Sequence, residues 1–219
     1  MFVDLIVVGG GAAGFFAGIT CAENSEKSVL ILEKTSQLLQ KVKISGGGRC
    51  NVTHNCFGPR ELSRHYPRGE KSLIGPFHRF GAADTVDWFA GRGVTLKTEA
   101  DGRMFPDTDS SQTIVDTLLG AADAAGVSVR SSEGVISVVK NGDDFELMTD
   151  AGNSYTAASV LIATGGTRHA AGARLATSLG HALQPPTPSL FTFKIKDRRI
   201  DGLAGLAVNP AEVRIEQSK

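Results

Sequence analysis

The first fourteen residues constrain the fold of this chain most strongly. An apolar run, Leu5 to Val8, leads directly into the glycine pattern Gly-x-Gly-x-x-Gly at positions 9, 11 and 14. A helical pattern follows, and a second apolar run at residues 28–32 ends on Glu33. A strand, a glycine-rich turn, a helix and a second strand in this order predict a βαβ unit that binds a dinucleotide.

Each part of this pattern has a physical role. Gly9 permits the tight turn after the strand, Gly11 lets backbone amides approach a pyrophosphate, and Gly14 lets the helix pack closely on the sheet. The phosphates are expected at the N-terminus of the helix, where free amides and the helix dipole favour an anion. Glu33, nineteen positions after Gly14, is placed to accept hydrogen bonds from both hydroxyls of an adenosine ribose. The unit by itself leaves FAD and NAD open.

Composition limits the partners that we expect. The chain has 41% hydrophobic residues, and 23 Lys plus Arg balance 23 Asp plus Glu. Zero net charge carries no signal for nucleic acid or an anionic membrane, so small-molecule partners are expected, without nucleic acid or membrane. No apolar run is long enough to span a bilayer, and no signal peptide is indicated. Three cysteines are too few for a disulfide scaffold, which favours a cytoplasmic location and leaves the oligomeric state open.

Later segments indicate an α/β fold. Helices are expected over residues 82–92 and after Ser110 or Ser111, with a strand at 94–98 between them. Strands follow at 127–130, 135–140, 145–149 and 154–156, with a hairpin turn at 141–144, and a final parallel strand at 159–163 returns to the central sheet. We expect a Rossmann-like domain with a parallel central sheet and an antiparallel β-meander over residues 1–186. A proline-rich linker leads into the start of a second, β-rich domain over 187–219.

The order of these elements resembles a known group of proteins. A meander before a strand that ends in Ala163-Thr164-Gly165 resembles the layout of the flavoproteins with two dinucleotide-binding domains. The motif at residues 43–53, Lys-Ile-Ser-Gly-Gly-Gly-Arg-Cys-Asn-Val-Thr, is similar to the signature of the BaiN-like bacterial flavoproteins, also labelled NAD(P)/FAD-dependent or aminoacetone-oxidase-like oxidoreductases. Segments similar to later landmarks of that family follow in the family's order, at 103–106, 164–166, 179–181 and 188–190.

The resemblance implies an FAD-dependent oxidoreductase linked to NADH or NADPH. In such an enzyme hydride passes from the nicotinamide to the flavin, and then to an organic acceptor such as an activated alkene, or to oxygen. The residues implied to bind FAD are Gly9, Gly11, Ala12, Ala13, Gly14, Glu33, Lys34, Lys43, Gly46, Gly47, Gly48, Arg49, Cys50, Asn51, Val135, Ala163, Thr164 and Gly165. Lys43 or Arg49 would neutralise phosphate or the charge of a reduced flavin.

Catalytic side chains are harder to assign. No carboxylate pair, catalytic triad or metal-ligand spacing stands out, so the catalytic residues stay unknown and no metal is expected. Cys50 has no Cys-x-x-Cys partner, and a buried structural thiol is favoured over a redox role.

The chain departs from the family's pattern in two places. Members of the family are considerably longer, and their loop after the segment that corresponds to 164–166 is longer as well. The chain is therefore expected to be a fragment, a truncated product or one half of a split arrangement. Two alternatives to the oxidoreductase stay open. One is a module that binds FAD or ADP-like ligands without turnover, and the other is an NAD-dependent dehydrogenase, against which the meander argues.

Overall fold

The computed structural model describes residues 1–66, 68–166, 171–185, 195–203, 212 and 214. The chain divides into two compact units, residues 1–184 and residues 185–219. In the second unit the described structure is a short 3-10 turn at Arg198–Ile200. The expected start of a β-rich second domain over 187–219 stays a prediction, since most of that segment lies outside the described residues.

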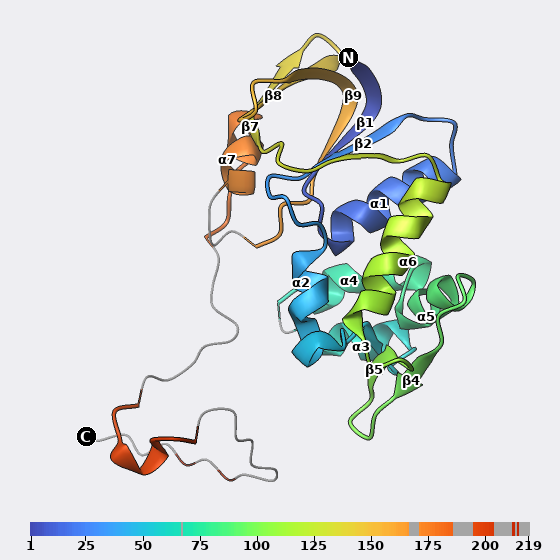
Figure 1. Ribbon diagram of the computed structural model, residues 1–219, viewed down its shortest axis with the longest axis vertical. Coiled ribbons are helices and arrows are strands. Elements are labelled where there is room, and N and C mark those ends of the chain that lie inside the picture. The colour runs from blue at the N-terminus through green and yellow to red at the C-terminus, as the bar shows by residue number, and fades with distance from the viewer. Residues whose placement is uncertain (67, 167–170, 186–194, 204–211, 213, 215–219) are drawn as a thin grey trace. The chain divides into compact units, whose positions relative to one another are not determined.

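The first unit is built on a six-stranded sheet (Figure 1). Its strands, in spatial order, are β6 (Ser128–Arg130), β2 (Val29–Leu32), β1 (Phe2–Val8), β9 (Ser154–Ile162), β8 (Asp144–Thr149) and β7 (Val135–Asn141). The first four are parallel, while β8 and β7 are antiparallel to their neighbours. The predicted α/β class, with a parallel sheet and an antiparallel meander, is confirmed.

Strand β9 belongs to both parts of the sheet. It pairs with β1 from Thr156 to Ile162, and its first residues also pair with β8. The prediction of separate strands at 154–156 and 159–163 is wrong, because Ala157 and Ala158 form no turn and pairing with β1 continues past them. The predicted strand near residue 127 lies at the outer edge of the parallel sheet and not in the meander.

The two faces of the sheet are covered differently. Helices α1 (Ala12–Glu23) and α6 (Ser111–Ala124) pack on one face, around Val7 and Ile31. The meander and helix α7 (Ala171–Ser178) cover the other face, around Ile6 and Leu30 (Figure 1). All four residues of β2 are buried, as expected for a parallel strand that is covered on both sides.

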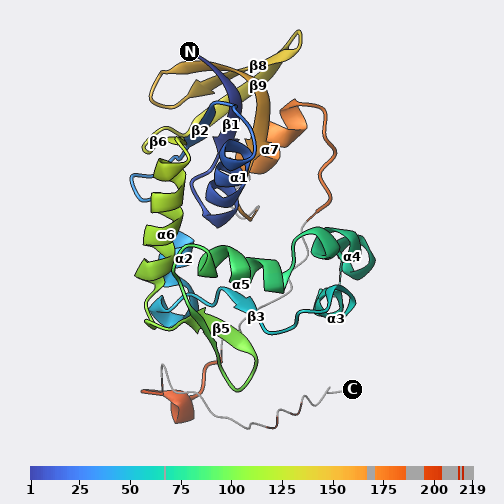
Figure 2. The same cartoon turned by 90° about the vertical axis from the view of Figure 1, so that its right-hand side faces the viewer.

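A second region follows β2 along the chain and lies beyond the N-terminal end of α1 (Figure 2). Its elements are α2 (Gln40–Ile44), a 3-10 turn (Ser45–Gly48), α3 (Pro59–Arg64), α4 (Glu70–Arg79), α5 (Ala82–Ala90) and a small sheet in the order β3 (Thr53–His54), β5 (Arg103–Pro106), β4 (Leu96–Thr98). Helix α5 and the Ser110 N-cap of α6, which accepts a hydrogen bond from the Gln112 amide, agree with prediction. Helices α3 and α4 had no counterpart in the sequence analysis.

A buried carboxylate ties β6 to β9. Glu133 is 8% exposed and accepts hydrogen bonds from the Tyr155 hydroxyl, at 2.7 Å, and from the Asn153 amide, at 2.8 Å. Arg130 donates to the same hydroxyl at 2.9 Å. Burial and the neighbouring Glu133 raise the pKa of Tyr155.

Removal of this hydroxyl is expected to destabilise the fold. Tyr155→Phe leaves one oxygen of Glu133 without its partner, and we expect the free energy of unfolding to fall by about 1–3 kcal/mol. Urea unfolding at pH 7 measures this. Tyr66→Phe is the matched control, because it removes a hydroxyl from an exposed tyrosine. Equal effects of the two substitutions would contradict a structural role for the Glu133 network.

Candidate dinucleotide site

The glycine loop after β1 lies between two neighbouring turns. The Gly9 amide donates to the Leu32 carbonyl at 2.8 Å, and the Ala163 amide donates to the Val8 carbonyl at 2.8 Å. Gly9 has a φ of +118°, and a Cβ there would lie 2.6 Å from the Ala163 carbonyl oxygen. The close approach of the loop to the turn at 163–165 therefore requires glycine at position 9.

Gly14 is tightly packed, whereas Gly11 faces open space. A Cβ at Gly14 would lie 2.0 Å from the Gly9 carbonyl oxygen, so the first turn of α1 packs directly on the glycine loop. A Cβ at Gly11 would have no heavy atom within 4 Å, and Gly11 lines a cavity. The structure therefore gives Gly14 a packing role and leaves open space beside Gly11, as the sequence pattern predicts.

The Glu33 carboxylate holds the glycine loop against the end of β2. One of its oxygens accepts a hydrogen bond from the Gly10 amide at 2.7 Å, and the other accepts from the Thr35 amide at 2.8 Å and from the Thr35 hydroxyl. The sequence pattern predicts that this carboxylate binds a ribose, which stays a prediction. In the structure the carboxylate organises the glycine loop. Each carboxylate oxygen has two lone pairs, so three of the four accepting sites are used and one remains, on the oxygen that accepts from the Gly10 amide.

A cavity of about 310 Å³ lies over this loop. Of the predicted FAD-binding residues, the structure brings together here Gly9, Gly11, Ala12, Ala13, Glu33, Ala163, Thr164 and Gly165. The N-terminus of α1 opens at the same place, with neither a side-chain cap nor an acidic residue in its first turn. Its unpaired amides and helix dipole make this end of the cavity suitable for an anion.

Lys41 is the charged residue of this cavity wall that was not predicted from the sequence. It lines the 310 Å³ cavity, and a Cβ on Gly165 would lie 3.1 Å from its Nζ. Lys41 and Lys43 both lie on the five-residue helix α2, where residues two apart point to different sides. The sequence shows two lysines on this turn but not which of them faces the glycine loop.

A second cavity, of about 470 Å³, continues from the first. The two share the wall residues Ala12, Ala13, Lys41 and Val42. The second is mostly apolar, with Phe16, Trp88 and Phe89 in its wall, and it includes the predicted residues Cys50 and Asn51. Burial raises the pKa of the Cys50 thiol, which therefore stays protonated near neutral pH.

Other predicted residues lie apart from these two cavities. Lys43, Gly46, Gly47, Gly48 and Arg49 line neither. The Arg49 guanidinium lies 2.5 Å from a Glu99 carboxylate oxygen and stacks on the Phe105 ring at 4.0 Å, and Glu99 raises the pKa of Arg49. A role for these residues toward FAD stays a prediction.

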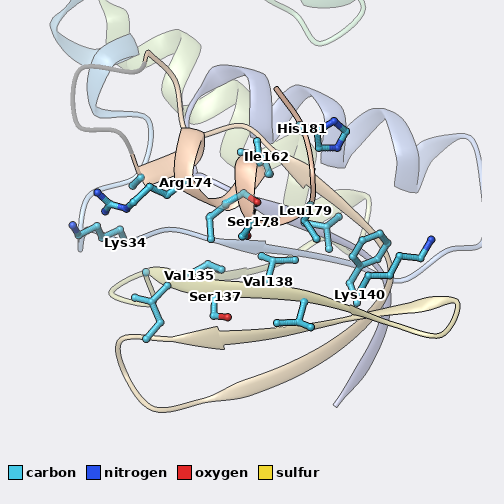
Figure 3. A pocket seen from close by; sticks show the side chains of 18 of the residues that line it. Lys34, Val135, Ser137, Val138, Lys140, Ile162, Arg174, Ser178, Leu179 and His181 are labelled. Atoms are coloured by element: carbon cyan, nitrogen blue, oxygen red, sulfur yellow. Dashed lines mark hydrogen bonds between the residues drawn. The ribbon is translucent and has the colours of Figure 1, made fainter. Parts of the chain in front are cut away.

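Lys34 and Val135 line a third cavity. It has a volume of about 1010 Å³ and lies between α7 and the β7–β8 hairpin (Figure 3). Gly134 packs closely beside Lys34, since a Cβ there would meet the Lys34 Cγ at 2.9 Å. The structure thus places these two predicted residues in the wall of this third cavity and not in the wall of the cavity over the glycine loop. Their role toward FAD also stays a prediction.

Comparison with known proteins identifies the family. The family model of the HI0933-like protein Rossmann domain matches residues 3–197. The chain belongs to the HI0933-like family. The resemblance to BaiN-like flavoproteins inferred from the sequence is thereby confirmed, and the HI0933-like chain is related to FAD-dependent oxidoreductases.

Two curated relatives of this HI0933-like chain are named as different enzymes. It is 27% identical over 207 residues to a 3-dehydro-bile acid delta(4,6)-reductase of Clostridium scindens, covering 91% of this chain and 49% of the relative. It is 30% identical over 214 residues to a ribosomal RNA dihydrouridine synthase of Escherichia coli, covering 94% of this chain and 52% of the relative. The chain therefore spans about half the length of the curated relatives that it matches.

Solved structures share the fold. The THI4 protein of Thermovibrio ammonificans is 16% identical with a TM-score of 0.57, and the match covers 83% of this chain and 64% of that one. A 3-ketosteroid-delta4-(5alpha)-dehydrogenase of Rhodococcus jostii is 18% identical with a TM-score of 0.56, over 75% of this chain and 46% of that one. Within the described part of the HI0933-like chain, no helix has the length and apolarity to cross a membrane, and no three His, Cys, Asp or Glu side chains gather as a metal site would require.

Proposed function

We propose that this chain is the FAD-binding half of a flavoprotein reductase. The observation that carries the proposal is the junction at Lys41, where a cavity over the glycine loop meets a largely apolar one. A dinucleotide with a flavin at one end needs a place for phosphates beside a place for a flat apolar ring. The two volumes fall within the range of small-molecule sites.

The residues present fit this cofactor. Gly11 and the first amides of α1 would hold the pyrophosphate, with Lys41 as its cation. Glu33 would accept a ribose hydroxyl at its remaining lone pair while it keeps its bond to the Gly10 amide. The turn at Ala163–Gly165 would close the opposite side of the dinucleotide. When bound, FAD would supply two-electron chemistry, with a reduced nicotinamide as the donor of hydride and an activated alkene or oxygen as its acceptor.

The names of the relatives favour an alkene as the acceptor. One is named a delta(4,6)-reductase and the other a dihydrouridine synthase. A dihydrouridine is a uridine whose ring double bond has gained two hydrogens, so both names describe the saturation of a carbon–carbon double bond. The role proposed for this chain's own residues is binding, orientation and exclusion of water. The substrate would be held in part by sequence that the relatives have beyond the matched half.

The visible spectrum of the purified 219-residue chain tests the proposal. We expect the visible absorption bands of bound oxidised flavin after addition of FAD and removal of the excess. Anaerobic addition of NADH or NADPH is expected to bleach these bands. Bound flavin that neither nicotinamide reduces would favour a dinucleotide-binding module without turnover. A chain that stays colourless with added FAD would contradict the proposed cofactor site.

A further inference from the structure

The zero net charge of the chain hides an uneven distribution. Residues 59–79, which contain α3 and α4 and are here called the basic hairpin, carry five cations and two carboxylates. The five cations all have exposed side chains and are Arg60, Arg64, Arg68, Lys71 and Arg79. Within the part of the chain that the structure describes, none of the five forms an ion pair. The hairpin therefore carries a formal charge of +3 and offers unneutralised cations to an anionic ligand.

A cavity of about 350 Å³ lies beside the basic hairpin. Leu62 of α3, Tyr66 and Phe77 of α4 line it together with Phe80. Tyr66 is 44% exposed, and its ring lies 5.4 Å from that of Phe77, so this ring borders both the cavity and solvent. Figure 2 shows α3 and α4 side by side, joined through α5 to the rest of the fold. The volume is near the lower limit of small-molecule sites, which suits one flat ring and its sugar rather than a whole dinucleotide.

His54 gives this cavity an unused hydrogen-bond acceptor. The Asp101 carbonyl lies 3.0 Å from His54 Nε2 and can only accept, so Nε2 donates and Nδ1 is an acceptor. That Nδ1 is buried and has no hydrogen-bond partner among the described residues. A ligand amide that reaches it after a small shift of the cavity wall would satisfy it. A flat ring that carries a carboxamide suits the aromatic wall and this acceptor together.

The 350 Å³ cavity continues into the proposed flavin site. It shares Asn51, Val52, Phe80 and Thr85 with the 470 Å³ cavity. The 470 Å³ cavity in turn shares Lys41 with the cavity over the glycine loop. A ring in the 350 Å³ cavity would therefore lie next to a ring in the 470 Å³ cavity, and hydride transfer between two rings needs such a contact.

The glycine loop can hold one dinucleotide. The chain contains one Gly-x-Gly-x-x-Gly pattern, and the proposed function assigns it to FAD. The hydride donor of the same reaction is a second dinucleotide, so within this chain it needs a site of another kind. Such a site has to bring the nicotinamide ring against the flavin and to provide cations for the phosphates. The cavity and the basic hairpin beside it meet these two requirements.

We propose that the 350 Å³ cavity receives the nicotinamide ring of NADH or NADPH and that the basic hairpin binds its phosphates. This inference rests on the proposed function, because it assigns a site to the hydride donor of the same reductase. In the step that the site serves, the C4–H bond of the donor breaks, and the hydride passes to the flavin together with one proton from water. The donor then leaves as the oxidised pyridinium.

Calorimetric titration of the FAD-loaded 219-residue chain with NADP⁺ and with NAD⁺ tests the phosphate contacts. The oxidised forms cannot reduce the flavin, and bound FAD keeps the glycine loop occupied. Arg60→Gln/Arg64→Gln removes two hairpin cations, and the matched control Lys27→Gln/Lys140→Gln removes two exposed cations elsewhere. We expect the hairpin variant to weaken NADP⁺ by about tenfold and NAD⁺ by less, since NADP⁺ has one phosphate more. The control should bind both ligands like the parent.

His54→Phe tests the position of the ring. Phenylalanine keeps a flat ring but has no nitrogen that accepts from a carboxamide, so we expect the affinity for NADP⁺ to fall by about 3- to 10-fold. The analogue of NADP⁺ in which an acetyl group replaces the carboxamide has no N–H to donate, and its affinity should be equal in the parent and in His54→Phe. Equal losses for the two ligands would overturn the placement of the nicotinamide ring.

Three further results would overturn the inference. One is NADP⁺ binding that falls equally in the two double variants, or in neither. Another is hairpin-dependent binding of an RNA 12-mer without binding of NADP⁺, which would make the hairpin a nucleic-acid surface and contradict the partners expected from composition. The third is a chain that binds no FAD, which overturns the proposed function as well. The visible spectrum of each sample is recorded first, so loss of the flavin site and loss of the nicotinamide site are distinguished.

Discussion

Gly14→Ala is expected to destabilise the protein severely. The added methyl group would lie 2.0 Å from the Gly9 carbonyl oxygen, and neither the oxygen nor α1 can move without disturbing β1. Overpacking in a core lowers stability by about 1–3 kcal/mol, and a clash with backbone belongs at or above the upper end of that range. We expect the urea concentration at the midpoint of unfolding to fall clearly, and the yield of soluble chain to fall with it.

Gly11→Ala is the matched control and separates packing from ligand binding. Gly11 has a φ of −91°, which alanine adopts readily, and the new methyl group would meet no protein atom within 4 Å. Stability should therefore stay within about 0.5 kcal/mol of the parent. The methyl group would project where the pyrophosphate is proposed to lie, so FAD affinity should fall by about tenfold or more. If Gly11→Ala bound FAD as the parent does, the cavity over the glycine loop would not be the dinucleotide site.

Lys41→Ala is expected to cause the largest loss of FAD affinity without unfolding the chain. Lys41 is exposed, so its removal should disturb packing little. A charge-assisted hydrogen bond contributes about 1.5–3 kcal/mol, which corresponds to roughly 10- to 150-fold in the dissociation constant. The dissociation constant is measured by titrating the chain with FAD and monitoring flavin fluorescence.

Lys43→Ala serves as the control, because this lysine has the same charge and lies on the same short helix but outside both cavities. We expect Lys43→Ala to bind FAD like the parent and Lys41→Arg to recover part of the affinity. The resemblance carried by the motif at residues 43–53, in contrast, implies that Lys43 or Arg49 supplies the neutralising cation. If FAD affinity fell more with Lys43→Ala than with Lys41→Ala, Lys43 and not Lys41 would be the cation at the dinucleotide site.

The parts of the fold that are determined by residues close together in the sequence could be predicted. The βαβ unit could be predicted because glycine spacing and apolar runs report turn geometry and burial within a few residues of each other. The hairpin turn was equally readable, since Gly142 has a φ of +61° and joins β7 to β8.

The features that escaped prediction depend on tertiary contacts or on very short elements. Helix α3 has only six residues, and helix α4 begins after Gly69 and contains Pro76, so neither shows a clear helical periodicity in the sequence. Arg49 resembles a ligand residue in the sequence, yet its carboxylate partner Glu99 comes fifty positions later. The side of α2 on which Lys41 lies is likewise set by packing, which no spacing rule reports.

The position of β1 at the centre of the sheet has a consequence for the order of folding. One of its neighbours, β2, is made within about twenty-five residues, but the other, β9, begins to pair with it only at Thr156. At a synthesis rate of about 5–20 residues per second, β1 waits roughly 8–30 seconds for that partner. During this interval one edge of an apolar strand is open, and the glycine loop lacks the turn at 163–165 that confines it. A nascent chain of this protein is therefore most vulnerable to aggregation, and most dependent on chaperones, just before its ligand site can form.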